Sequence, residues 1–186
     1  MSTGFYQKLK AYFIDAKEPA EISVEPTFQR PDISCDAFFN YSIILPEADE
    51  PSQEILVMGS LAIKNHGIKD VHRPLICLRI QPVEGSRLGG KIGTLKKQER
   101  FLHAAPLEEW DYVHTDWKER IKARGEHWLR PLHCDVIHPG DMLIFSSFDL
   151  SFSLPRDSRS VVVDGFVYCD EFPSGIAAAN SIIINF

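Results

Sequence analysis

The sequence lacks the long apolar run that a membrane helix requires. No stretch of its 186 residues approaches the roughly 20 consecutive apolar residues that span a bilayer, and the N-terminus shows no basic-then-apolar leader. An excess of positive charge is also missing: the formal net charge is −6, whereas phosphate recognition needs clustered Lys and Arg. We therefore expect a cytoplasmic protein with no transmembrane segment and no nucleic-acid partner.

Paired metal-binding motifs are absent as well. The sequence contains no CxxC pair and no HExxH, and its four cysteines lie far apart, at Cys35, Cys77, Cys134 and Cys169. Such cysteines are typical of buried free thiols, which behave as small hydrophobic residues. We expect no cofactor and no resident metal.

One cluster of ligand-type residues keeps an alternative open. His133, Cys134 and His138 lie within six residues of one another, with His127, Asp135 and Asp141 close by. They could belong to a metal site, or Cys134 and His138 could form a nucleophile–base pair. Adjacent residues on a strand face apart, however, so a site here would need ligands from elsewhere.

A phosphate-binding loop is incomplete. Gly85–Lys91 fits the spacing GxxxxGK, but the next position is Ile92, where a nucleotide-binding loop carries the hydroxyl that holds Mg²⁺. A glycine-rich surface turn is the prediction for this segment.

What the sequence does have is strand periodicity. Hydrophobic residues make up 44% and charged residues 25%, a composition that is typical of globular domains. Alternation of apolar and polar residues, or a short apolar run, predicts roughly seven or eight strands. The predicted strands include residues 21–25, 33–45, 55–64, 75–80, 142–154, 161–169 and 182–186.

The N-terminal segment has helical spacing. Phe5, Leu9 and Phe13 recur every four residues, with Lys8 and Lys10 on the opposite side. A helix of this length is marginal in water, so its apolar stripe needs cover from the core, a second copy or another protein. The few lysines disfavour a membrane surface, and we expect self-association through this helix.

The middle of the chain predicts a helical insert over about residues 95–125. Leu107, Trp110, Trp117 and Ile121 recur at helical spacing, and Gly125 stands where a helix would end. We expect this face to cover the sheet. The alternative is that Trp110 and Trp117, seven residues apart on one helix face, form an aromatic platform for a sugar or a peptide together with the nearby Trp128.

Two segments resemble strand pairs of immunoglobulin-like sandwiches. Gly59–Gly67 ends in a turn at Asn65-His66-Gly67, and Pro74–Ile80 follows as the next strand. No Trp lies between Cys35 and Cys77, unlike in antibody-type domains. The resemblance implies an immunoglobulin-like antiparallel β-sandwich and carries no active site with it.

The expected organisation is a single domain over residues 1–186, and a division near residue 94 is the alternative. Its parts are an N-terminal helix (1–18), a first strand set (19–94), a helical insert (95–130) and a second strand set (131–186).

The predicted function is non-catalytic. We expect a protein-interaction or scaffold module that binds a protein partner or a second copy through Phe5, Leu9, Phe13, Trp110 and Trp117. The alternative is a metal-binding protein or small enzyme that uses the region of Cys134 and His138.

Overall fold

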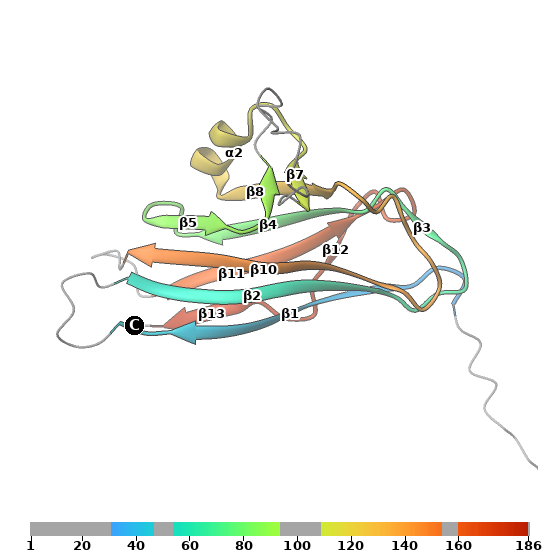
Figure 1. The fold of residues 1–186 in the computed structure, drawn as a ribbon, viewed down its shortest axis with the longest axis horizontal. Helices are drawn as coiled ribbons and strands as arrows, with labels where there is room; N and C mark the ends of the chain where they lie inside the picture. Colours follow the sequence, from blue (N-terminus) through green and yellow to red (C-terminus); the bar gives the residue numbers. More distant parts are fainter. Residues whose placement is uncertain (1–30, 47–53, 94–108, 154–159, 186) are drawn as a thin grey trace, which may run out of the picture.

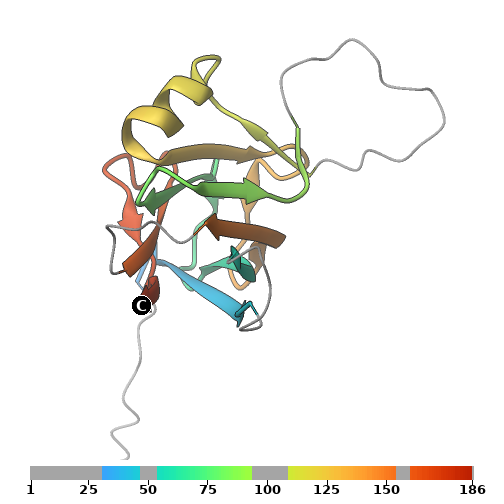
Figure 2. The same ribbon diagram turned by 90° about the vertical axis from the view of Figure 1, so that its left-hand side faces the viewer.

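The computed structural model describes residues 31–46, 54–93, 109–153 and 160–185. Two β-sheets face each other across a buried core, and a short helix lies over one end of the second sheet (Figures 1 and 2). The mostly-β prediction is therefore confirmed.

The predicted N-terminal helix, with Phe5, Leu9 and Phe13, lies outside the described residues. No helix in the described ranges has both the length and the apolar character needed to cross a membrane.

The first sheet has four antiparallel strands in the order β1-β2-β10-β5. Their bounds are Cys35–Ile44 (β1), Glu54–Asn65 (β2), Met142–Ser153 (β10) and Ser86–Gly89 (β5). Strand alternation directs one face of each strand inward, for example Phe39, Leu61 and Leu150.

A bulge in β10 corrects one detail of the sequence pattern. The pairing of β10 with β2 shifts between Phe145 and Phe148, and Ser147 has a φ of 52°. An extra residue reverses which side chains face inward. Met142 and Ile144 are therefore exposed, although each stands an even number of residues before the buried Phe148 and simple alternation would put all three on one face.

The second sheet follows the order β12-β11-β4-β8-β7-β6, and β13 also pairs with β11. The bounds are Ile176–Ala177 (β12), Ser160–Tyr168 (β11), Leu75–Gln81 (β4), Glu126–Pro131 (β8), Trp110–Tyr112 (β7), Ile92–Gly93 (β6) and Ile182–Asn185 (β13). Burial in β11 alternates at every position, so Val161, Val163 and Val167 face the core while Phe166 and Tyr168 face outward.

A two-stranded sheet closes one end of the molecule. It pairs β3 (Val71–His72) with β9 (Val136–Ile137). The buried side chain of Asn65 fixes this end, because its amide donates to the carbonyl oxygens of Lys69 (2.8 Å) and Ile137 (2.9 Å). These bonds tie the turn that leads from β2 into β3 to the strand β9.

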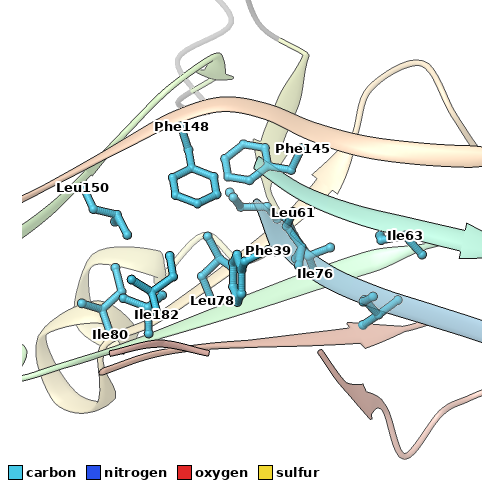
Figure 3. Close-up of a cluster of buried hydrophobic side chains, with 14 of the residues drawn as sticks. Phe39, Leu61, Ile63, Ile76, Leu78, Ile80, Phe145, Phe148, Leu150 and Ile182 are labelled. Atoms are coloured by element: carbon cyan, nitrogen blue, oxygen red, sulfur yellow. The ribbon is translucent and has the colours of Figure 1, made fainter. Parts of the chain in front are cut away.

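Phenylalanine rings pack among leucine and isoleucine side chains in the core between the sheets (Figure 3). The rings of Phe39 and Phe148 meet edge to face with centroids 6.2 Å apart. Glycine provides the space: a Cβ atom at Gly59 would lie 2.8 Å from the Phe148 ring, and one at Gly165 would lie 2.8 Å from the Phe39 ring. Gly165 belongs to the second sheet, so Phe39 of the first sheet joins the two layers.

The predicted helical insert is only partly correct. Helix α2 covers Trp117–Arg124 and ends at Gly125, whose φ of 71° fits the left-handed conformation expected of a glycine stop. Trp110, by contrast, lies in strand β7 between β6 and β8. Pairing with β8 therefore overrides the helical spacing, and Trp110 and Trp117 do not share a helix face.

The two tryptophans consequently differ in burial. Trp110 is 2% exposed and meets Phe145 edge to face, whereas Trp117 is half-buried and stacks on Tyr112. Helix α2 contains no buried residue. Trp110 therefore lies in the core, and Trp117 packs against the core while staying partly buried. Leu107 lies outside the described residues.

This difference gives a stability prediction. Trp110→Ala removes a fully packed ring and should lower the free energy of unfolding by about 3–5 kcal/mol. Trp117→Ala loses mainly one ring stack and should cost about 1–2 kcal/mol. Urea unfolding of both variants measures the difference. Equal losses would contradict the difference in burial between Trp110 and Trp117.

Candidate functional site

A cavity of about 600 Å³ opens on the outer face of the second sheet. It lies where β4 begins and where β8 and β11 end, since β4 runs antiparallel to both neighbours. We call it the Trp128 pocket. The strands contribute Leu75, Trp128, Arg130, Pro131 and Tyr168, and the loops contribute Arg73, Pro74, Cys134, Asp135, Cys169, Asp170 and Pro173.

Two aromatic rings form one wall of the Trp128 pocket. The ring centroids of Trp128 and Tyr168 lie 4.8 Å apart, and the Trp128 Nε1 atom donates to the Glu126 carboxylate at 3.0 Å. Gly175 closes in behind Tyr168, because a Cβ atom there would lie 2.5 Å from the ring. With a φ of 76°, Gly175 also adopts a conformation that other residues rarely tolerate. The Glu126 carboxylate thus fixes the Trp128 ring, and the close packing of Gly175 fixes the Tyr168 ring.

Arg73 contributes a strained backbone to the pocket. Its φ of 51° is unusual for a residue other than glycine. The Arg73 amide donates to the carbonyl oxygen of Asp135 at 2.7 Å, and its Nε atom donates to the Asp170 carboxylate at 2.7 Å. Strained residues concentrate at functional sites, where the surrounding structure holds them in place.

The turn before Arg73 is anchored by Glu171. The Glu171 carboxylate accepts from the backbone amide of His72 at 2.9 Å and lies 2.7 Å from the His72 Nδ1 atom. Burial opposes the charge on Glu171, but these hydrogen bonds outweigh it and lower the pKa of Glu171 to about 2. The charged carboxylate therefore fixes the connection between β3 and the end of β11.

Arg130 supplies a cation with spare donors. Its nearest acidic partner is Asp111 on the neighbouring strand β7, at 3.7 Å, which is longer than a hydrogen bond. The Arg130 side chain is 52% exposed, whereas Asp111 is buried. Among the described residues, the Asp111 Oδ1 atom has no hydrogen-bond partner. Most of the guanidinium donors are thus available to a bound molecule.

Of the cysteines and ligand-type residues that the sequence analysis named, Cys134, its neighbour Asp135 and Cys169 line this pocket, whereas His133 and His138 do not. The Cys134 thiol donates to the carbonyl oxygen of Val136 at 3.3 Å. His138 instead lies 2.9 Å from Asp70, which raises the pKa of its imidazole through a hydrogen bond and the nearby charge. Cys134 and His138 therefore form hydrogen bonds with other residues and not with each other, whereas a nucleophile–base pair would be joined by one.

The alternative metal site does not assemble from these residues. His133 is exposed, and the described part of the chain contains no group of three or more His, Cys, Asp or Glu residues placed to hold a metal. Cys35, Cys77 and Cys169 are buried free thiols, as predicted, and Cys134 is half-buried. Burial raises the pKa of the Cys35 and Cys77 thiols to about 12. These two thiols stay protonated at neutral pH.

Sequence reasoning named Trp128 only as a neighbour of the predicted aromatic platform, and it missed Tyr168, Arg73 and Arg130. Tyr168 stands at the outward-facing end of an alternating strand, and Trp128 and Arg130 share that spacing in β8. These patterns predict a common face within each strand. They do not predict that β8 and β11 flank the same strand, β4, which is what brings the residues together.

No protein-family model and no curated protein matches the sequence. Several solved structures show a distant likeness, among them the following two. The putative ApaA protein from Bordetella pertussis shares 12% identity, covers 84% of this chain and 97% of its own, and gives a TM-score of 0.39. The structural-genomics target SoR45 shares 9% identity, covers 82% of this chain and 87% of its own, and gives a TM-score of 0.40.

The Glu171 anchor predicts a specific acid sensitivity. Because its pKa is lowered from about 4.3 in an unfolded chain to about 2, its contribution is present above about pH 4.3 and is lost as the pH falls towards 2. Glu171→Gln should therefore flatten the pH dependence of the free energy of unfolding in this window. Urea unfolding at stepped pH measures it.

The matched control is Glu119→Gln, on the exposed surface of α2. This variant should keep the slope of the unchanged protein. If Glu171→Gln also kept that slope, Glu171 would not be the charged anchor of the turn.

Proposed function

We propose that this chain is a non-catalytic protein-interaction module that receives a side chain of its partner in the Trp128 pocket. The observation that carries the proposal is the composition of the pocket. Trp, Tyr and Arg dominate the energetic centres of protein interfaces, and here Trp128, Tyr168, Arg73 and Arg130 line one cavity. A volume of about 600 Å³ is enough for a large side chain and its neighbours.

The polar groups suit an extended peptide segment. Arg130 can donate to a carbonyl or carboxylate oxygen of the partner, because its contact with Asp111 is long. Arg73 and Asp170 largely satisfy each other, so they shape the rim of the pocket. The aromatic wall would then bind an apolar or aromatic side chain by stacking and burial.

Two further expectations from the sequence belong to the same proposal. Self-association through Phe5, Leu9 and Phe13 is supported by their helical spacing alone. An immunoglobulin-like arrangement is supported by the two facing, mainly antiparallel sheets. Neither expectation depends on the Trp128 pocket.

Selection of phage-displayed random peptides on the purified protein tests the pocket. We expect enriched peptides whose affinity, measured by fluorescence polarisation, falls at least tenfold in Trp128→Ala and in Arg130→Ala. Because Arg130 is the nearest cation to the buried Asp111, a thermal unfolding curve of each variant first shows that it is folded.

Lys122→Ala, on the exposed surface of α2, is the matched control and should bind like the unchanged protein. Peptides that bind both pocket variants as tightly as the unchanged protein would contradict this assignment.

A further inference from the structure

A second cavity, of about 420 Å³, lies beneath helix α2. It occupies the corner where the chain passes from β5 in the first sheet to β6 in the second, with β7 and β8 on the far side. Figures 1 and 2 show α2 covering this end of β8, with β5 below it. We call this space the α2 cavity.

The walls of the α2 cavity are mostly apolar. Leu88 and Ile92 come from the β5–β6 corner, and Trp117 and Ile121 come from α2. All four are only partly buried although they adjoin the core. Protein interiors are normally close-packed, so apolar side chains left half-buried around an open volume indicate space for a ligand.

The aromatic rings are already arranged for such a ligand. Tyr112 and Trp117 stack with their centroids 4.3 Å apart and their planes within 10°. Stacking fixes the orientation of Trp117 although its helix contributes no buried residue to the core. This side of the cavity is therefore formed before any ligand binds.

A buried polar pair also lines the cavity. Tyr112 is 4% exposed and His127 is 5% exposed, and the Tyr112 hydroxyl lies 3.1 Å from the His127 Nδ1 atom. One hydrogen lies between these two atoms. Whichever group donates it, the other polar hydrogen of the pair can still be donated to a ligand oxygen.

Both members of the pair are uncharged at neutral pH. Burial lowers the pKa of His127 to about 4 and raises the pKa of Tyr112 to about 12. The same surroundings disfavour any charge that a ligand would bring. Arg87, an exposed residue of the cavity lining, donates from its Nε atom to the Ser151 hydroxyl at 3.3 Å.

We propose that the α2 cavity binds a small, uncharged, largely apolar molecule that carries one hydrogen-bond acceptor oxygen. The apolar walls and the Trp117 ring hold the body of the molecule, and the Tyr112–His127 pair donates to its oxygen. A pocket of this size, with apolar walls and a few polar groups, has the usual character of a small-molecule site. It is independent of the Trp128 pocket.

Three probes of similar shape test the chemistry. Acetophenone has the acceptor oxygen, ethylbenzene lacks it, and benzoate carries a charge. Saturation-transfer NMR should show acetophenone binding with a dissociation constant on the order of a millimolar or tighter. Ethylbenzene should bind about 2–10-fold more weakly, the difference one hydrogen bond makes, and benzoate should not bind measurably.

Variants then locate the site. Ile121→Trp fills the cavity from the helix side and Leu88→Phe fills it from the opposite wall, so each should abolish acetophenone binding. Ile144→Trp, on the exposed outer face of β10, is the matched control and should bind normally. A thermal unfolding curve shows that each variant is folded, and two filling variants guard against one that fails to fold.

Each contrary result overturns a defined part of the proposal. Binding that survives both filling variants would place the probe elsewhere. Equal affinities for acetophenone and ethylbenzene would remove the role of the Tyr112–His127 pair. Preferential binding of benzoate would show that the cavity accepts charge, and no binding of any probe would overturn the site itself.

Discussion

The contact between Phe39 and Gly165 sets the spacing between the two β-sheets of this protein. Phe39 lies on the edge strand β1, and its ring reaches a glycine on β11 where a Cβ atom would lie 2.8 Å away. The backbone of Phe39 is fixed at the same point, because its amide donates to the Asn180 side chain at 2.7 Å and its carbonyl accepts from it at 3.0 Å. Side-chain and backbone contacts thus join the layers at one residue.

The Trp128 pocket and the α2 cavity lie at different positions relative to the core. The Trp128 pocket lies on the outer face of the second sheet, so it carries charged groups such as Arg130 that remain in contact with water. The α2 cavity lies at the corner between the sheets, where burial keeps His127 and Tyr112 uncharged. Position relative to the core therefore determines which chemistry each cavity can offer.

Local patterns in the sequence predicted the strands and missed both cavities. Alternation located β2, β10 and β11, because a half-buried strand needs one apolar face. It failed at Ser147, where a bulge reverses the faces, and at Trp110, where pairing with β8 replaced helical spacing by a strand. Pockets form where strands that are distant in the sequence become neighbours in a sheet. Apolar periodicity within each strand does not predict which strands will pair.

A double-mutant cycle between Phe39 and Gly165 tests most directly whether their contact sets the spacing of the sheets. Gly165→Ala should lower the free energy of unfolding by about 1–3 kcal/mol, because its Cβ atom would overlap the Phe39 ring. In a Phe39→Leu background the overlap is relieved, so the same change should cost less, with an interaction energy on the order of 1 kcal/mol. An equal cost of Gly165→Ala in both backgrounds would contradict the claim that this contact sets the spacing of the sheets.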